Sequence, residues 1–167
     1  QITHLAPIIP GSAPLVPAEV PMPEPGEGEI PLQVTACGVC HTELDEIEGR
    51  TPPPRLPVVP GHQVVGRVEA VGPGVTGFQG GERVGVAWIF SACGSCGDCR
   101  AGRENLCPAF RGTGRDAHGG YAERMVVPAA FAHRLPDSLG DAEAAPLLCA
   151  GAVGYRALDM ARLEDGA

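Results

Sequence analysis

The chain has 167 residues and carries 20 acidic against 12 basic side chains, for a net charge of −8. This length is enough for one domain with its own core, and a second domain is not expected. The acidic balance and the lack of any basic cluster argue against nucleic acid and anionic membranes as partners. No apolar run approaches the ~20 residues that a membrane-spanning helix needs.

The start of the chain, at Gln1, does not show the basic, apolar and small-residue order of a signal peptide. We therefore expect a trimmed or processed chain that works in the cytoplasm. The 24 glycines and 18 prolines are spread between short apolar runs, as turns between strands would be. This distribution favours a mainly β barrel or sandwich over disorder.

Apolar periodicity predicts the elements in chain order. Residues 30–36 alternate apolar and polar side chains and predict a half-buried strand, at a sheet edge near Pro31 because proline cannot donate to a ladder. Helical spacing predicts a short helix over 41–48. Further patterns predict a strand over 58–71 broken at Pro60 and Gly61, a strand through Val84, Val86 and Trp88, strands over 121–127 and 131–135, and one long helix over 150–163 that ends at Asp165 and Gly166.

Four of the seven cysteines lie in one Gly-rich loop: Cys93, Cys96, Cys99 and Cys107. Their spacing, C-x2-C-x2-C-x7-C, lets four thiolates converge on one tetrahedral ion, as in structural zinc sites. A ferredoxin-type cluster uses C-x2-C-x2-C-x3-C-P, and Pro108 does follow the last cysteine, but the third gap here is longer. Disulfides are disfavoured in a reducing compartment. We expect a structural zinc ion that fixes the loop over 91–110 and does no chemistry.

Three other motifs match known signatures less well. The stretch from Gly72 to Gly77 fits G-x-G-x-x-G, but no helix is predicted after it, so a turn between strands explains it better than a dinucleotide site. Residues 37–41 fit the haem-attachment pattern C-x-x-C-H, yet haem would leave the four-cysteine loop unexplained. His41, Glu43 and the later C-x-x-C resemble a zinc deaminase, but alanine stands where that signature has proline.

Three further segments carry a cysteine or a histidine in a set order: Gly-Val-Cys-His-Thr-Glu-Leu over 38–44, Pro-Gly-His-Gln-Val-Val-Gly over 60–66, and Leu-Leu-Cys-Ala-Gly over 147–151. Together with the four-cysteine loop, this order resembles the zinc-dependent medium-chain alcohol dehydrogenases, from about Pro23 onward. The resemblance implies a mainly β, GroES-like barrel with short helices, a structural-zinc lobe and one C-terminal helix. It also implies a catalytic domain over 1–150, and over 151–167 the start of a helix that leads to a Rossmann domain missing from this chain.

The same resemblance assigns roles near the metal. Cys40, His62 and Cys149 would be the ligands of a catalytic zinc ion with a fourth position open. Such an ion acts as a Lewis acid while hydride passes between a carbinol carbon and NAD or NADP. Thr42 would take the alcohol proton, and a role as a solvent-facing helix cap is the open alternative. His41 would face the pyrophosphate of the cofactor.

Other positions depart from the family pattern or fit it loosely. Trp88 stands where the family has an aromatic wall of the substrate pocket, although strand alternation fits a core residue equally well. Glu43 replaces the aspartate that orients the ligand histidine, and Gln63 replaces a glutamate near the metal, which removes a charge. Asp45 replaces a relay histidine and could accept the proton itself or leave that step to water. Cys37 is expected to be a buried thiol at the end of a strand.

The sequence therefore predicts the catalytic domain of a zinc-dependent alcohol dehydrogenase that interconverts small alcohols and aldehydes. It predicts two zinc ions per chain, one catalytic and one structural, and NAD or NADP held mainly by the missing domain, without which this chain alone should not turn over. The full-length enzyme is expected to be a homo-oligomer. The alternative is a non-catalytic, zinc-stabilised structural or interaction module, in which Gln63 and Asp45 would mark lost chemistry.

Overall fold

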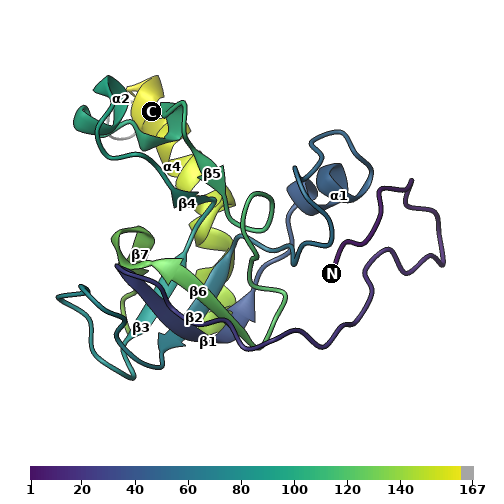
Figure 1. Ribbon diagram of the computed structural model, residues 1–167. Coiled ribbons are helices and arrows are strands. Elements are labelled where there is room, and N and C mark those ends of the chain that lie inside the picture. Colours follow the sequence, from purple (N-terminus) through teal and green to yellow (C-terminus); the bar gives the residue numbers. More distant parts are fainter. Residues whose placement is uncertain (163–167) are drawn as a thin grey trace.

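The computed structural model describes residues 1–162, and most of its strands and helices are short (Figure 1). The strands are β1 (Glu29–Cys37), β2 (Val64–Val68), β3 (Arg83–Val86), β4 (Ile89–Ser91), β5 (Arg111–Gly112), β6 (Arg124–Pro128) and β7 (Ala132–Arg134). The α-helices are α1 (His41–Ile47), α2 (Gly97–Arg100), α3 (Asp141–Ala144) and α4 (Ala150–Ala161), and the 3-10 helices are η1 (Glu104–Leu106), η2 (Ala129–Phe131) and η3 (Ala145–Leu148). The mainly β fold with short helices and one C-terminal helix is confirmed.

Five strands form one antiparallel sheet in the order β6-β1-β2-β3-β7, and β4 pairs separately with β5. Leu32 in the middle of β1 lies opposite Val68 of β2 on one side and Met125 of β6 on the other. All three side chains are buried in the main core. Each such aliphatic side chain contributes about 1.5–3 kcal/mol when it is fully buried. The alternating apolar residues of the sequence thus form the inner face of this sheet.

The expected edge position of Pro31 is wrong, because β1 lies in the middle of the sheet between β6 and β2. The ladder between β1 and β2 begins at Leu32, one residue after the proline. The carbonyl of Pro31 accepts from the backbone N–H of Glu69, so the proline nitrogen also faces the β2 side. It therefore stands at the end of that ladder, where the missing N–H interrupts no pairing.

The strand expected over 58–71 is shorter than predicted, since only β2 pairs within the sheet. Val58 lies outside the sheet and makes one isolated bridge with Ile2 of the N-terminal segment. The break is at Gly61, which has a φ of +100° and no room for a side chain: a Cβ there would lie 2.6 Å from the ring of Tyr121. Glycine is the residue that this conformation and this close contact require.

The strand expected to reach Trp88 ends two residues earlier, at Val86. The chain leaves the sheet there because Thr113 engages both following carbonyls. Its hydroxyl donates to the carbonyl of Ala87, and its N–H donates to the carbonyl of Trp88. Trp88 is accordingly half-buried and lies outside the core of the sheet.

The remaining differences are at the ends of elements and in one loop. The last two strands begin at Arg124 and Ala132, slightly later than predicted. The stretch from Gly72 to Gly77 connects β2 directly to β3, and no helix follows it. This agrees with a turn rather than a dinucleotide-binding loop. The predicted end of the last helix at Asp165 and Gly166 lies outside the described residues.

The N-terminal segment before β1 is mostly irregular, and Figure 1 shows it in purple as a long loop. It is fixed to α1 by the N–H of Ala6, which donates to the carbonyl of Ile47, and by the N–H of Ile8, which donates to Glu48. At the other end of the chain, α4 extends away from the sheet and buries none of its side chains. Among the described helices, none has both the length and the apolar character to cross a membrane.

Candidate metal site and its surroundings

Three side chains from distant parts of the chain meet at one point: Cys40, His62 and Cys149. The Sγ atoms of the two cysteines are 3.8 Å apart, and Nε2 of His62 is 3.3 Å from Sγ of Cys149. Their three donor atoms all lie within 4.8 Å of one another. We call this group the three-donor cluster.

The geometry of the three-donor cluster fits a zinc ion. Tetrahedral zinc with bonds of ~2.3 Å to sulfur and ~2.0 Å to imidazole nitrogen separates two sulfurs by about 3.8 Å and a sulfur from a nitrogen by about 3.5 Å. The observed separations are close to these values, and both cysteines are free thiols. Three ligands leave the fourth tetrahedral position for a small molecule.

Each donor occupies a local feature of the chain that fixes its direction. Cys40 is the N-cap of α1, and Cys149 is the N-cap of α4, at the junction with η3. His62 follows the tightly packed Gly61 and is 1% exposed. Helix N-termini therefore fix the positions of the two cysteines, whereas close packing in the protein interior fixes that of the histidine.

Glu43 links the first ligand segment to the second. One carboxylate oxygen accepts from the backbone N–H of Cys40 at 2.7 Å and caps α1. The other lies 2.7 Å from Nδ1 of His62, a close contact that departs from ideal hydrogen-bond angles. A carboxylate behind a ligand histidine orients the ring and leaves Nε2 for the metal. The glutamate that replaces the family's aspartate therefore reaches the histidine.

Without a metal, the pKa values of the three donors are shifted in different directions. For Cys40, burial raises the pKa, but hydrogen bonds from Thr42 and Cys149, together with the charge of His62, outweigh burial and the pKa is lowered. For Cys149, burial and the neighbouring Cys40 thiolate raise the pKa to about 11. For His62, burial lowers the pKa, but the carboxylate of Glu43 and the thiolate of Cys40 together raise it by more. Metal binding here must displace a proton from the second thiol.

The other predicted residues on α1 lie at different distances from the cluster. Oγ1 of Thr42 is 3.6 Å from Sγ of Cys40, so this hydroxyl is beside the three-donor cluster. Asp45 binds Arg50 and lies 3.6 Å from Nε2 of His41, whose side chain is 75% exposed. Among the hydrogen bonds of the described chain, none joins Asp45 to Thr42.

Trp88 lies against the buried ligand histidine. Its ring meets the ring of His62 edge-on, with centroids 5.0 Å apart, and it also contacts Phe110. Gln63 is 3% exposed and packs under Gly38, whose backbone N–H donates to the Gln63 carbonyl. Both residues therefore border the ligand histidine, Trp88 in space and Gln63 in sequence.

The four cysteines of the loop also converge, with their sulfurs within 4.8 Å of one another. We call this the four-cysteine cluster. Sγ of Cys93 accepts from the N–H of Cys96, and Sγ of Cys107 accepts from that of Ala109. Backbone hydrogen bonds lower the pKa of Cys93 to about 6, while burial raises that of Cys99 to about 12. Four sulfurs and no open position are the features of a structural zinc site.

Two further ionisable residues outside both clusters are Cys37, which is half-buried, and Glu46, which is buried. Cys37 ends β1 as expected, and burial raises its pKa to about 12. Glu46 is fully buried, and neither of its carboxylate oxygens has a hydrogen-bond partner within the described chain. Burial, and then the charge of Glu43, raise its pKa to about 8. Sequence reasoning missed Glu46; its only signal is the three-residue spacing from Glu43, which puts both on one helix face.

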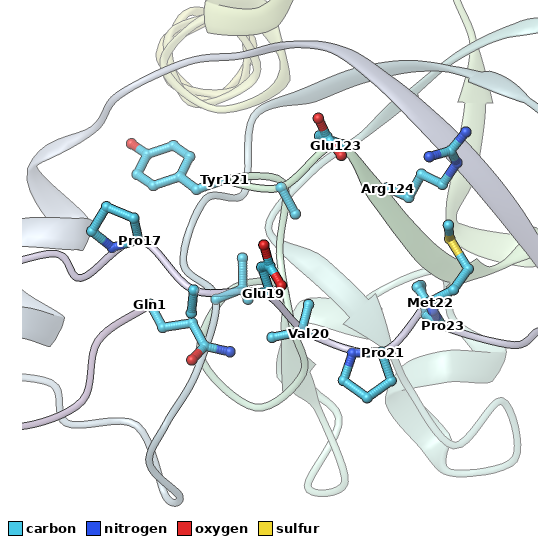
Figure 2. Close-up of a pocket in the computed structure, with 13 residues that line it drawn as sticks. Gln1, Pro17, Glu19, Val20, Pro21, Met22, Pro23, Tyr121, Glu123 and Arg124 are labelled. Atoms are coloured by element: carbon cyan, nitrogen blue, oxygen red, sulfur yellow. The ribbon is translucent and has the colours of Figure 1, made fainter.

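A cavity of about 640 Å³ lies between the N-terminal segment and the start of β6 (Figure 2). Glu19, Tyr121 and Glu123 are on its wall, and the guanidinium of Arg124 pairs with Glu69. None of the metal-donor residues lines this cavity. It therefore does not extend the candidate site.

The comparisons with known proteins agree with this geometry. The alcohol dehydrogenase GroES-like domain family matches residues 26–137. A probable alcohol dehydrogenase of Mycobacterium tuberculosis is 50% identical over 171 residues, which cover 99% of this chain and 49% of that protein. This chain thus spans about half the length of the curated relatives that it matches.

Solved structures give the same result. The cobalt- and zinc-bound thermostable alcohol dehydrogenase from Pyrobaculum aerophilum is 34% identical, with a TM-score of 0.77 over 86% of this chain and 45% of that one. The acetophenone reductase from Geotrichum candidum, in complex with NAD, is 32% identical, with a TM-score of 0.82 over all of this chain and 50% of that one. The chain therefore belongs to the zinc-dependent medium-chain alcohol dehydrogenases and carries their GroES-like domain.

Proposed function

We propose that this chain is the catalytic half of an alcohol dehydrogenase and that its three-donor cluster holds the catalytic zinc ion. The observation that carries the proposal is the meeting of two thiols and one imidazole within 4.8 Å, with room for a fourth ligand. Zinc bound there would supply Lewis-acid stabilisation of negative charge on a substrate oxygen. The substrates would be small alcohols and their aldehydes.

The residues around the cluster have separate tasks in this proposal. Glu43 orients His62 through Nδ1, so that the ring keeps Nε2 unprotonated and directed at the cluster. Thr42, whose hydroxyl is 3.6 Å from the ligand sulfur of Cys40, takes the proton of the alcohol. Trp88, packed against His62, forms a wall that shields the reacting atoms from water.

The outward path of the proton uses exposed groups of α1. Asp45 is 28% exposed and close to His41, but it makes no hydrogen bond to Thr42 within the described chain. A water molecule would therefore have to connect Thr42 to Asp45, which serves as the final acceptor. His41, at the first turn of α1 and largely exposed, is available to the pyrophosphate of NAD or NADP.

The nucleotide would be held mainly by a second domain. The acetophenone reductase that binds NAD is about twice as long as this chain. We propose a catalytic domain over 1–150, with α4 as the start of the connection to a Rossmann domain. The four-cysteine cluster would hold a second, structural zinc ion that stabilises the loop over 91–110.

Metal analysis tests the central part of this proposal. We expect two zinc ions per chain, and one in Cys149→Ser, which should keep its fold. The matched control is Cys37→Ser, which removes a half-buried thiol outside both clusters and should keep two ions. A content of one zinc ion in the unaltered chain would instead support the non-catalytic, zinc-stabilised module.

Turnover assays test the reaction. The 167-residue chain alone should not reduce NAD or NADP with primary alcohols, because most of the nucleotide site is absent from it. A longer protein that contains this chain followed by a Rossmann domain should do so, and Cys149→Ser should abolish that activity. Robust turnover by the isolated chain would contradict the proposal that a second domain holds the nucleotide.

A further inference from the structure

A second cavity, of about 600 Å³, lies between the loop that follows α1 and the turn that follows β5. It is lined by Pro54, Arg55, Pro57, Val58, Arg111, Arg115, Asp116, Ala117 and His118. No residue of the three-donor cluster or of the four-cysteine cluster borders it. Its volume is in the range of ~300–1,000 Å³ that is usual for small-molecule sites. We call it the arginine cavity.

The arginine cavity is basic although the chain as a whole is acidic. Arg55, Arg111 and Arg115 face one carboxylate, that of Asp116, so the charged lining carries an excess of two positive charges. The whole chain has a net charge of −8. A positive concavity in a negative protein is a feature that needs an explanation, because it attracts anions locally.

The guanidinium groups of the cavity retain donors that no group among residues 1–162 uses. Arg55 makes no hydrogen bond or ion pair within residues 1–162. Arg111 donates once, to the carbonyl of Asp116, and lies over the ring of Phe90. Only Arg115 has a carboxylate partner, Asp116. By contrast, most arginines outside the cavity pair with a carboxylate of the chain.

Two neighbouring groups leave this positive character intact. Nδ1 of His118 accepts from the backbone N–H of Val59, so the ring proton of the neutral imidazole is on Nε2, which is a donor. The buried carboxyl of Glu46 interacts electrostatically with the guanidinium of Arg115. Burial raises its pKa to about 8, so at neutral pH it is mostly protonated and does not neutralise the arginine.

We propose that the arginine cavity is a binding site for a small phosphate monoester. Guanidinium groups bind phosphate oxygens through paired, charge-assisted hydrogen bonds. A phosphate monoester carries a charge of about −1.5 to −2 at pH 7, which matches the excess charge of the lining. The site is independent of the proposed dehydrogenase chemistry, since no metal donor takes part in it.

The chain contains an internal reporter for this site. Trp88 is its single tryptophan, and its ring packs against Gly112, at the start of the turn that carries Arg115 and Asp116. A Cβ at Gly112 would lie 3.2 Å from the indole ring. A ligand that orders this turn should therefore change the tryptophan fluorescence.

The test is a titration of the zinc-loaded chain with glycerol 3-phosphate, followed by calorimetry and by tryptophan fluorescence. Inorganic phosphate, sulfate and succinate are compared at matched ionic strength. We expect one saturable site for the phosphate monoester. Arg55→Gln should weaken binding about tenfold, the loss expected for one exposed charged hydrogen-bond donor. Arg55→Lys keeps the charge and loses the planar fork of the guanidinium. Its affinity for the monoester should lie between that of the unaltered chain and that of Arg55→Gln.

The matched control is Arg67→Gln, because Arg67 is an exposed arginine of β2 without a carboxylate partner and outside the cavity. It changes the net charge equally and should leave binding within about twofold. Equal weakening by Arg55→Gln and Arg67→Gln would overturn the proposal, as would tighter binding of succinate than of the monoester. Absence of a saturable transition in the unaltered chain would overturn it as well. Arg55 is exposed and unpaired, so its variants should keep the fold, which circular dichroism verifies.

Discussion

The two metal-donor clusters of this molecule are built in opposite ways. The four-cysteine cluster takes all its donors from one loop, with the first and last only 14 positions apart. The three-donor cluster joins Cys40 to Cys149, which are 109 positions apart, and adds a histidine from the interior. The first can form as soon as its loop closes, whereas the second exists only when the sheet and both helix ends are in place.

This difference predicts how each cluster contributes to stability. The four-cysteine cluster without metal leaves a Gly-rich loop with little apolar burial, so a metal bound there would supply most of the order of that loop. The three-donor cluster is held by the surrounding fold, so a metal bound there would add function to a structure that already exists. The predictions below test this contrast.

The largest effect is expected from the local cluster. Cys99→Ser removes a buried ligand and should lower the free energy of unfolding by at least about 3 kcal/mol, with loss of one zinc ion. Ser95→Ala is the control, because Ser95 only donates to a ligand sulfur from an exposed position. Denaturant unfolding with metal analysis measures both. If Cys149→Ser destabilised the chain as much as Cys99→Ser, the contrast between the clusters would be wrong.

The second effect concerns metal affinity in the three-donor cluster. Glu43→Ala removes the carboxylate behind His62 and should weaken zinc binding there about 10–100-fold. It also removes the cap on the N–H of Cys40, which costs about 1 kcal/mol of stability. Glu43→Asp should recover part of the affinity. Chelator competition provides the measurement, and unchanged affinity in Glu43→Ala would contradict the orienting role.

A third effect is a pH dependence from the buried Glu46. Its folded-state pKa of about 8 lies above the ordinary value of 4.5, so the folded chain keeps a proton that the unfolded chain releases. The associated stability is complete below the lower value and is lost as the pH rises through the higher one. Glu46→Gln should flatten the pH profile of the unfolding free energy, and an unaltered profile would show that Glu46 does not titrate in this window.

The smallest effect distinguishes Cys37 from the six cysteines of the clusters. Removal of zinc with a chelator should expose those six to an alkylating reagent. Cys37 should remain the slowest to react. The thiolate is the reactive form, and burial in the sheet, which raises the pKa of Cys37 to about 12, persists without zinc. The pKa of Cys99 is raised to the same value, but its loop should open when zinc is removed. Mass spectrometry of alkylated peptides measures the order. Early labelling of Cys37 would mean that the end of β1 opens before the clusters do.

The ease of prediction from sequence follows the same contrast. The four-cysteine cluster could be predicted from spacing alone, since all its geometry is local. The three-donor cluster required a family resemblance, because no spacing rule links His62 to a cysteine 87 positions later. The central position of β1 could not be inferred, and Pro31 was wrongly placed at an edge, because the place of a strand in a sheet depends on its partners. Glu46 was missed because a buried acid looks in sequence like any exposed helical glutamate.

The helix α4 begins directly at Cys149 and buries none of its own side chains. It presents Val153, Tyr155 and Leu158 to the surroundings instead. A molecule that bound along α4 and tilted the helix would displace Sγ of Cys149, the residue that caps its N-terminus. If the three-donor cluster binds a metal ion, a displacement of α4 would therefore change the position of one of its three donor atoms.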